Sequence, residues 1–227
     1  MTGAQMLNLD VSVVERTEPF QLFTANGLLD QSQLDDLRST APTADAELIA
    51  VDDPRHEKQY RMNLVSLVET ESNTAHVDSL PPNWTELVAE LRGDRFTDWL
   101  TEATGIDLAG TQRSIGIYTH RNGDFLSVHK DKPTKAITVI IYLNTDWPEE
   151  AGGRYQGFAS GDRDGRPVFE IMPVGGQLLA FRPTDRSWHA VSEIAHPDGV
   201  ERVTVQVEYW LTTELAGSAY KPATDQL

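Results

Sequence analysis

The chain contains no cysteine among its 227 residues, which excludes disulfide bonds and thiolate metal sites. It also has no stretch approaching the roughly 20 consecutive apolar residues of a membrane-spanning helix. Its first residues show neither the basic start nor the apolar run of a secretory signal. We therefore expect a globular protein with a cytoplasmic location and no membrane partner.

Positive charge is scarce as well, because 19 Lys and Arg residues stand against 35 Asp and Glu residues, for a formal net charge of −16 at pH 7. Residues 1–113 carry 8 basic and 20 acidic side chains, whereas residues 114–227 carry 11 and 15. A negative field of this size repels phosphate backbones, so no nucleic-acid partner is expected. The less acidic C-terminal half is better suited to an anionic ligand.

The first half of the chain predicts helices with a few strands. Asp30 is placed to cap a helix, with Gln33 in the capping-box position, and Leu34 and Leu37 fall on one face. Residues 40–57 are expected to form a polar connection, and residues 60–68 predict a strand.

A pair of helices is predicted next. Asn83 is placed to cap the first helix, Gly93 to end it, and Gly105 to end the second. The apolar and aromatic residues between these positions recur at helical spacing. We interpret them as core that packs against a sheet and not as a cofactor site.

From residue 114 onward the pattern changes to β-rich runs separated by turn-forming clusters. Eight runs after a helical segment are typical of an α+β protein with a mainly β core, a double-stranded β-helix (jelly roll) of eight strands backed by N-terminal helices. We expect one domain over residues 1–227, with a support region at 1–112, the jelly-roll core at 113–213 and an irregular tail at 214–227. The runs cover residues 114–120, 124–129, 136–144, 154–159, 168–173, 177–183, 188–194 and 201–211.

His129 and Asp131 lie two residues apart where the second run enters a turn. Side chains at this spacing on a strand point to the same side. An imidazole and a carboxylate are two of the three ligands of the facial triad that holds non-haem ferrous iron. The third candidate is His189 on the seventh run, because the second and seventh strands of a jelly roll are neighbours. Taken singly, each of these residues is more often a solvated strand end or a hydrogen-bonded core histidine.

Arg202 opens the eighth run, and its face continues through Thr204, Gln206 and Glu208, with valines on the other face. If the valines pack against helices, the polar face turns into the barrel, where an arginine requires an anionic partner. The guanidinium is suited to bidentate binding of a carboxylate. Tyr142, near the end of the third run, would lie beside it. The competing interpretation is a surface salt bridge from Arg202 to Glu201 or Glu208.

In this order, the motif His129-Lys130-Asp131, then His189, then Arg202 resembles the signature of the 2-oxoglutarate-dependent Fe(II) oxygenases. Residues 114–211 resemble in particular the prolyl-4-hydroxylase-like branch. The further matching pieces are Tyr118, Asp131-Lys132-Pro133, Tyr142-Leu143-Asn144, Asp146-Trp147, Gly152-Gly153, the segment 173–181 and Trp188-His189-Ala190-Val191.

The resemblance implies a dioxygenase that uses Fe(II), 2-oxoglutarate and O2, with ascorbate as a candidate stimulant. His129, Asp131 and His189 would be both the metal ligands and the catalytic residues, while Arg202 and Tyr142 would hold the far carboxylate of 2-oxoglutarate. Tyr118 would hydrogen-bond the cosubstrate near the metal. Similar halogenases carry Ala or Gly in the acidic position, so Asp131 favours hydroxylation, with release of succinate and CO2. Desaturation and ring closure are the alternatives, because they depend on how the substrate is placed.

The expected substrate is an amino acid, a peptidyl or carrier-bound amino acid, or a related small metabolite. Its recognition is assigned to Thr204, Gln206, Glu208 and Arg182, with the segments 40–57 and 70–81. The alternatives are a non-catalytic cupin-like protein that binds a metal or a small ligand, and an iron dioxygenase that needs no 2-oxoglutarate.

Overall fold

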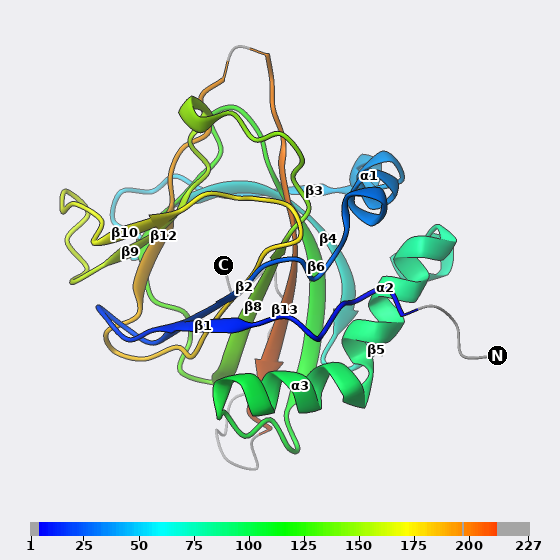
Figure 1. Cartoon of the computed structure of the whole chain (residues 1–227). Coiled ribbons are helices and arrows are strands. Elements are labelled where there is room, and N and C mark those ends of the chain that lie inside the picture. Colours follow the sequence, from blue (N-terminus) through cyan, green and yellow to red (C-terminus); the bar gives the residue numbers. More distant parts are fainter. Residues whose placement is uncertain (1–4, 197, 213–227) are drawn as a thin grey trace.

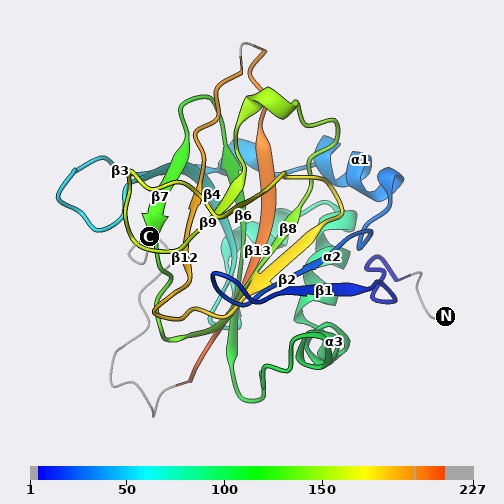
Figure 2. The same ribbon diagram turned by 60° about the vertical axis from the view of Figure 1, so that its left-hand side comes forward.

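The computed structural model describes residues 5–196 and 198–212, and all thirteen strands in these ranges join one strongly curled antiparallel sheet (Figure 1). The order along the sheet is β1-β2-β11-β8-β13-β6-β4-β7-β12-β9-β10, with β3 and β5 both pairing with β4. Because the sheet folds back on itself, β9, β10 and β12 lie opposite the wall that contains β8, β13 and β6 (Figure 1), and β7 lies beside β12 (Figure 2). This is the jelly-roll arrangement that the sequence predicts.

Each β-rich run predicted from residue 114 onward contains a strand. The predicted neighbours are also confirmed, because β7 pairs with β12 and β13 pairs with β8. The strands of this region are β6 (Gln112–His120), β7 (Phe125–His129), β8 (Lys135–Tyr142), β9 (Tyr155–Phe158), β10 (Phe169–Ile171), β11 (Leu178–Phe181), β12 (Trp188–Val191) and β13 (Arg202–Trp210).

The N-terminal half extends the same sheet, so the sheet is larger than the eight-stranded jelly roll of the prediction. Strand β2 (Leu22–Ala25) pairs with β1 (Val13–Arg16) and β11, and β4 (Tyr60–Glu69) pairs with β6 and β7. The polar connection expected at residues 40–57 is partly wrong, because β3 (Glu47–Val51) pairs with β4 inside it. Strand β5 (Ser72–Asn73) completes this part.

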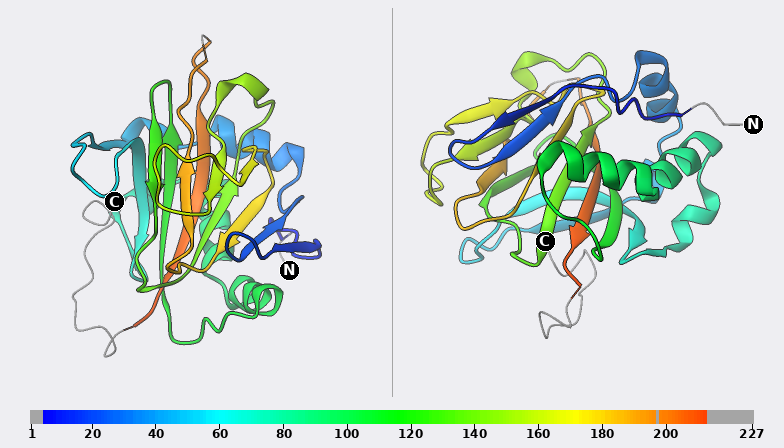
Figure 3. Two further views of the ribbon diagram at one scale, coloured as in Figure 1. Left: turned by 90° about the vertical axis from the view of Figure 1, so that its left-hand side faces the viewer. Right: turned by 60° about the horizontal axis from the view of Figure 1, so that its bottom comes forward.

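Three α-helices cover the outer face of the wall formed by β6, β8 and β13 (Figure 3). They are α1 (Gln31–Ser39), α2 (Pro82–Arg92) and α3 (Asp94–Thr104), and the short 3₁₀ turns are η1 (Thr43–Asp45), η2 (Ala75–Ser79) and η3 (Glu149–Ala151). None of the helices in the described ranges has both the length and the apolar character that crossing a membrane requires.

The helix ends test the predicted caps. Asp30 and Gln33 form the capping box of α1, and Gly105 ends α3 in the left-handed conformation, with φ of 69°. The predicted cap at Asn83 is wrong, because α2 begins at Pro82 after Pro81. The Asn83 side chain instead donates to Asp36 and Thr40 and so joins α2 to the end of α1.

Strand β13 has one apolar and one polar face, as predicted. Val203, Val205 and Val207 are completely buried in the main core, together with the apolar faces of the helices. The side chains that alternate with them, beginning at Arg202, face the interior of the barrel. The tail predicted at residues 214–227 lies outside the described residues.

Candidate functional site

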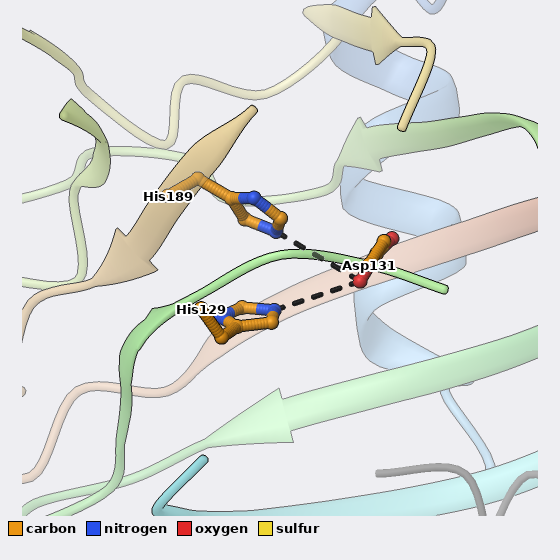
Figure 4. A group of neighbouring side chains, drawn as sticks. All are labelled: His129, Asp131 and His189. Atoms are coloured by element: carbon orange, nitrogen blue, oxygen red, sulfur yellow. Dashed lines mark ion pairs between the residues drawn. The ribbon is translucent and has the colours of Figure 1, made fainter. Parts of the chain in front are cut away.

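The site is built on the β7–β12 pair, where His129 and His189 lie directly opposite each other. Their ring centroids are 4.1 Å apart. Asp131 follows β7 by two residues, and its Oδ1 lies 3.5 Å from His129 Nε2 and 3.9 Å from His189 Nε2 (Figure 4). One ligand atom from each residue lies within 4.8 Å of the other two, so the three side chains could hold one metal ion. We call these residues the triad.

Backbone carbonyls fix the orientation of both imidazoles. His129 Nδ1 lies 2.9 Å from the Ser127 carbonyl oxygen, and His189 Nδ1 lies 2.8 Å from the Ser187 carbonyl oxygen. Because a carbonyl oxygen can only accept, each Nδ1 carries the proton and each Nε2 keeps its lone pair. Both lone pairs are therefore directed at the place where a metal would bind.

The electrostatics keep the triad in the protonation state that binds metal. Burial lowers the pKa of His129 to about 3, with Lys58 and His189 acting in the same direction, and lowers the pKa of His189 to about 4. Burial alone would raise the pKa of Asp131, but Lys135 and His129 hold it well below its ordinary value. Two neutral imidazoles and one carboxylate are thus present at neutral pH.

Asp131 is held in position by two residues that the sequence analysis did not identify, Lys135 and Thr138. Its Oδ2 accepts from Thr138 Oγ1 at 2.7 Å and from Lys135 Nζ at 3.1 Å, which leaves Oδ1 facing the histidines. Lys135 also donates to Glu208 at 2.6 Å. Lys135 and Thr138 lie at the start of β8, and the short turn between β7 and β8 returns them to the carboxylate that precedes β8.

The donor set fits ferrous iron. His129 Nε2 is buried and has no hydrogen-bond partner in the described part of the chain, so nothing else uses its lone pair. A pair of imidazoles with one carboxylate, all on one side of the metal, is the arrangement typical of non-haem Fe(II) oxygenases.

Arg202 is buried deeper in the barrel, with 1% of its surface exposed. None of its guanidinium nitrogens has a hydrogen-bond acceptor within the described ranges, and burial lowers its pKa. The alternative salt bridges do not occur, because Glu201 pairs with Arg121 and Glu208 with Lys135. An unpaired buried guanidinium is costly, and an anionic ligand would remove that cost.

Tyr142 is the side chain beside this guanidinium. The Arg202 Cζ lies 5.1 Å from the centre of the tyrosine ring, and the hydroxyl is fully buried with no hydrogen-bond partner of its own among the described residues. Burial raises the pKa of this hydroxyl, an effect that Arg202 partly offsets. The hydroxyl therefore stays protonated and is able to donate to an anion.

The triad and Arg202 line one internal cavity, which we call the inner cavity. Of the other residues predicted for the site, Tyr118, Gln206 and Glu208 line it too. Thr204 is fully buried and donates to the Tyr118 carbonyl at 3.5 Å. Arg182 is exposed and does not line this cavity.

The inner cavity also contains two residues that sequence reasoning missed. His120 lies opposite Arg202 in the β6–β13 pairing, is 1% exposed, and has no hydrogen-bond partner for either ring nitrogen within the described residues. Tyr155 stacks on His189, with ring centroids 5.4 Å apart, and its hydroxyl is also unpartnered there. Neither residue stands in a motif, so only its position in the barrel reveals it.

The sequence of residues 115–211 matches the model of the 2OG-Fe(II) oxygenase superfamily. A search of the curated proteins gave no match.

Solved structures share the fold at low sequence identity. A Pseudomonas putida prolyl-4-hydroxylase aligns with a TM-score of 0.56 and 14% identity, over 84% of this chain and 92% of that one. A Trichoplax adhaerens prolyl hydroxylase in complex with a hypoxia inducible factor peptide fragment aligns with a TM-score of 0.59 and 16% identity, over 88% of this chain and 87% of that one. HygX from Streptomyces hygroscopicus, with nickel, 2-oxoglutarate and hygromycin B bound, aligns with a TM-score of 0.54 and 10% identity, over 88% of this chain and 91% of that one.

Proposed function

We propose that this chain, which belongs to the 2OG-Fe(II) oxygenase superfamily, hydroxylates an aliphatic C–H bond of an amino acid, a peptidyl or carrier-bound amino acid, or a related small metabolite. It is a 2-oxoglutarate-dependent dioxygenase, and its family uses Fe(II), 2-oxoglutarate and O2. The observation that carries the proposal is that the triad and an unpaired buried arginine line the same cavity.

The triad would hold the iron. When bound, iron with 2-oxoglutarate and O2 supplies an oxidative decarboxylation that gives succinate and CO2 and oxidises a C–H bond. The chain's own part is to present two neutral imidazole nitrogens and one carboxylate oxygen. Lys135 and Thr138 hold the other oxygen of that carboxylate, so Asp131 cannot turn away from the metal.

Arg202 would bind the distal carboxylate of 2-oxoglutarate. Its planar guanidinium can donate two parallel hydrogen bonds, and the Tyr142 hydroxyl can add a third. This pairing would remove the cost of the buried charge, so the interaction favours 2-oxoglutarate over a neutral ligand of similar size. Tyr118, which lines the same cavity, remains the proposed cosubstrate contact nearer the metal.

Hydroxylation is the outcome that the acidic ligand favours. Asp131 occupies the position that is Ala or Gly in the halogenases that the motif resembles, so no vacant ligand position is available for chloride. Among structures of this fold, one prolyl hydroxylase binds a peptide and HygX binds hygromycin B. These neighbours support a peptidyl or small-molecule substrate, with Gln206 and Glu208 as its proposed contacts inside the cavity.

An anaerobic titration tests the proposal. Fe(II) added with 2-oxoglutarate is expected to produce a weak visible charge-transfer band, and a screen of amino acids and peptides in air is expected to find compounds that stimulate succinate release. A cupin-like protein without catalysis would show neither the band nor succinate.

A further inference from the structure

His129 and Asp131 of the triad also border a second, more open cavity of about 430 Å³, which we call the outer cavity. It shares Lys58, His129, Asp131 and Lys135 with the inner cavity, so it lies where a substrate would approach the metal from outside.

The charge of the outer cavity is opposite to that of the chain. Five of its lining residues are lysine or arginine and two are carboxylates, although the whole chain carries a net charge of −16. One of the two carboxylates is Asp131, which already pairs with Lys135 and would be a metal ligand. Glu57 is the other. The cations are Lys58, Lys130, Lys132, Lys135 and Arg163.

Arg163 is held in place without being neutralised. Its Nη2 donates to the carbonyl oxygens of His56 at 2.6 Å and Glu57 at 2.8 Å, and its Nη1 lies 3.5 Å from that of Pro54. Carbonyl oxygens fix the position of the guanidinium but leave its full positive charge. The same bonds hold the segment before Lys58 against the loop that carries Arg163.

Lys58 lies at the junction of the two cavities. No carboxylate lies within salt-bridge distance of its amine in the described part of the chain, and the nearest aromatic contact is the Tyr60 ring at 5.7 Å. Burial lowers the pKa of Lys58 to about 8, with Lys135 and Lys132 acting in the same direction and Asp131 and Glu208 against it. An anion bound here would offset the desolvation of the amine.

Lys130 faces the same space, with its amine 4.8 Å from the centre of the Trp188 ring. Its carboxylate neighbour, Asp185 at 3.4 Å, is fully exposed, and an exposed pair of this kind contributes little. The aromatic ring thus positions this cation at the rim.

We infer that the substrate of this enzyme carries an anionic group, a carboxylate or a phosphate, which the outer cavity binds through Lys58 and Arg163 while the bond to be oxidised lies toward the triad. The inference rests on the proposed function only in that it takes the bound anion to be part of a substrate. The anion site itself does not depend on metal.

The test is an NMR titration of the metal-free, isotope-labelled full chain at low ionic strength with phosphate, with acetate and with neutral trimethyl phosphate. Phosphate or acetate is expected to give saturable amide shifts around residues 56–58, 130–132 and 161–163, and trimethyl phosphate none. Tighter binding of phosphate would favour a phosphorylated substrate, and tighter binding of acetate a substrate with a carboxylate.

Variants complete the test. Lys58→Met combined with Arg163→Gln is expected to weaken phosphate binding at least tenfold, while Arg95→Gln, which removes one charge on α3, leaves it within twofold. Unchanged binding in the double variant, shifts centred on Arg202 instead, or equal binding of trimethyl phosphate would each overturn the inference. Because no metal is present, these results are independent of the charge-transfer band, whose absence would overturn only the proposed function.

Discussion

His120 and Arg202 face each other across the β6–β13 pair, and the side chains of both are buried without a hydrogen-bond partner among the residues the structure describes. Two buried polar groups without hydrogen bonds on facing strands are uncommon in a folded protein, and such groups are often functional. The triad lines the same cavity. The pair therefore supports the proposal that the distal carboxylate of 2-oxoglutarate binds at Arg202.

Replacement of Arg202 tests this site in two ways. Arg202→Met is expected to raise KM for 2-oxoglutarate about 10- to 100-fold, because charge-assisted hydrogen bonds are lost. It is also expected to raise Tm when no 2-oxoglutarate is added, because an unpaired buried charge is removed. Each kcal/mol gained in unfolding free energy should raise Tm by about 2–4 °C. Steady-state kinetics and thermal denaturation measure the two effects. An unchanged KM would contradict the assigned role.

The histidines of the triad give the second prediction. His129→Ala and His189→Ala are each expected to abolish the anaerobic charge-transfer band and to lower succinate release by at least a hundredfold, with an unchanged circular dichroism spectrum. The segment 70–81, to which the sequence assigned substrate recognition, lines neither cavity, so His76→Ala in the 3₁₀ turn η2 is the matched control and should retain activity within twofold. Full activity in either triad variant would contradict the proposed metal site.

Lys135 gives the third prediction. Lys135→Met leaves Asp131 and Glu208 without their shared cation. The expected result is a 10- to 100-fold loss of Fe(II) affinity, the usual effect of removing a group that orients a ligand. The metal-free chain should also lose roughly 3–5 kcal/mol of unfolding free energy, because a buried charge is left unpaired. Lys130→Met, on the other side of Asp131, should change neither the Fe(II) affinity nor the unfolding free energy.

His120 gives a prediction for pH. Burial, assisted by Arg202, lowers the pKa of His120 well below the ordinary 6.5. As the pH falls through 6.5, this histidine therefore becomes protonated in the unfolded chain but stays neutral in the folded chain. Stability must then fall as pH decreases below 6.5, by about 1.4 kcal/mol per pH unit for each such histidine. In the metal-free chain, His120→Leu should reduce the slope of unfolding free energy between pH 6 and pH 5 by about that amount. The same substitution at His76 controls for loss of a histidine, and an unchanged slope in His120→Leu would contradict the assignment.

The sequence was enough to predict those parts of the site that depend only on local residue pattern and on strand order. His129 and Asp131 share a strand end, and the jelly-roll order alone predicts that His189 lies beside them. The alternation along β13 likewise separated the valines that pack under the helices from the face that begins with Arg202. Periodicity and topology carry this information without knowledge of individual contacts.

The parts that the sequence did not predict depend on contacts between strands. Lys135 and Thr138 show no motif, yet the turn between β7 and β8 returns both to Asp131, and the pairing of β8 with β13 brings Lys135 to Glu208. His120 looks like a strand-end residue of the kind usually exposed, and only the closure of the barrel buries it. Strand β3 lacks a strong alternation of apolar and polar residues. It forms because it pairs with β4, and the local sequence pattern does not show that pairing.

The most direct measurement of the central claim is anomalous X-ray diffraction from crystals grown anaerobically with Fe(II) and 2-oxoglutarate. The account predicts one iron peak bonded to His129 Nε2, His189 Nε2 and an oxygen of Asp131, with the distal carboxylate of 2-oxoglutarate on Arg202. Iron bound elsewhere, or a carboxylate that does not contact Arg202, would contradict it.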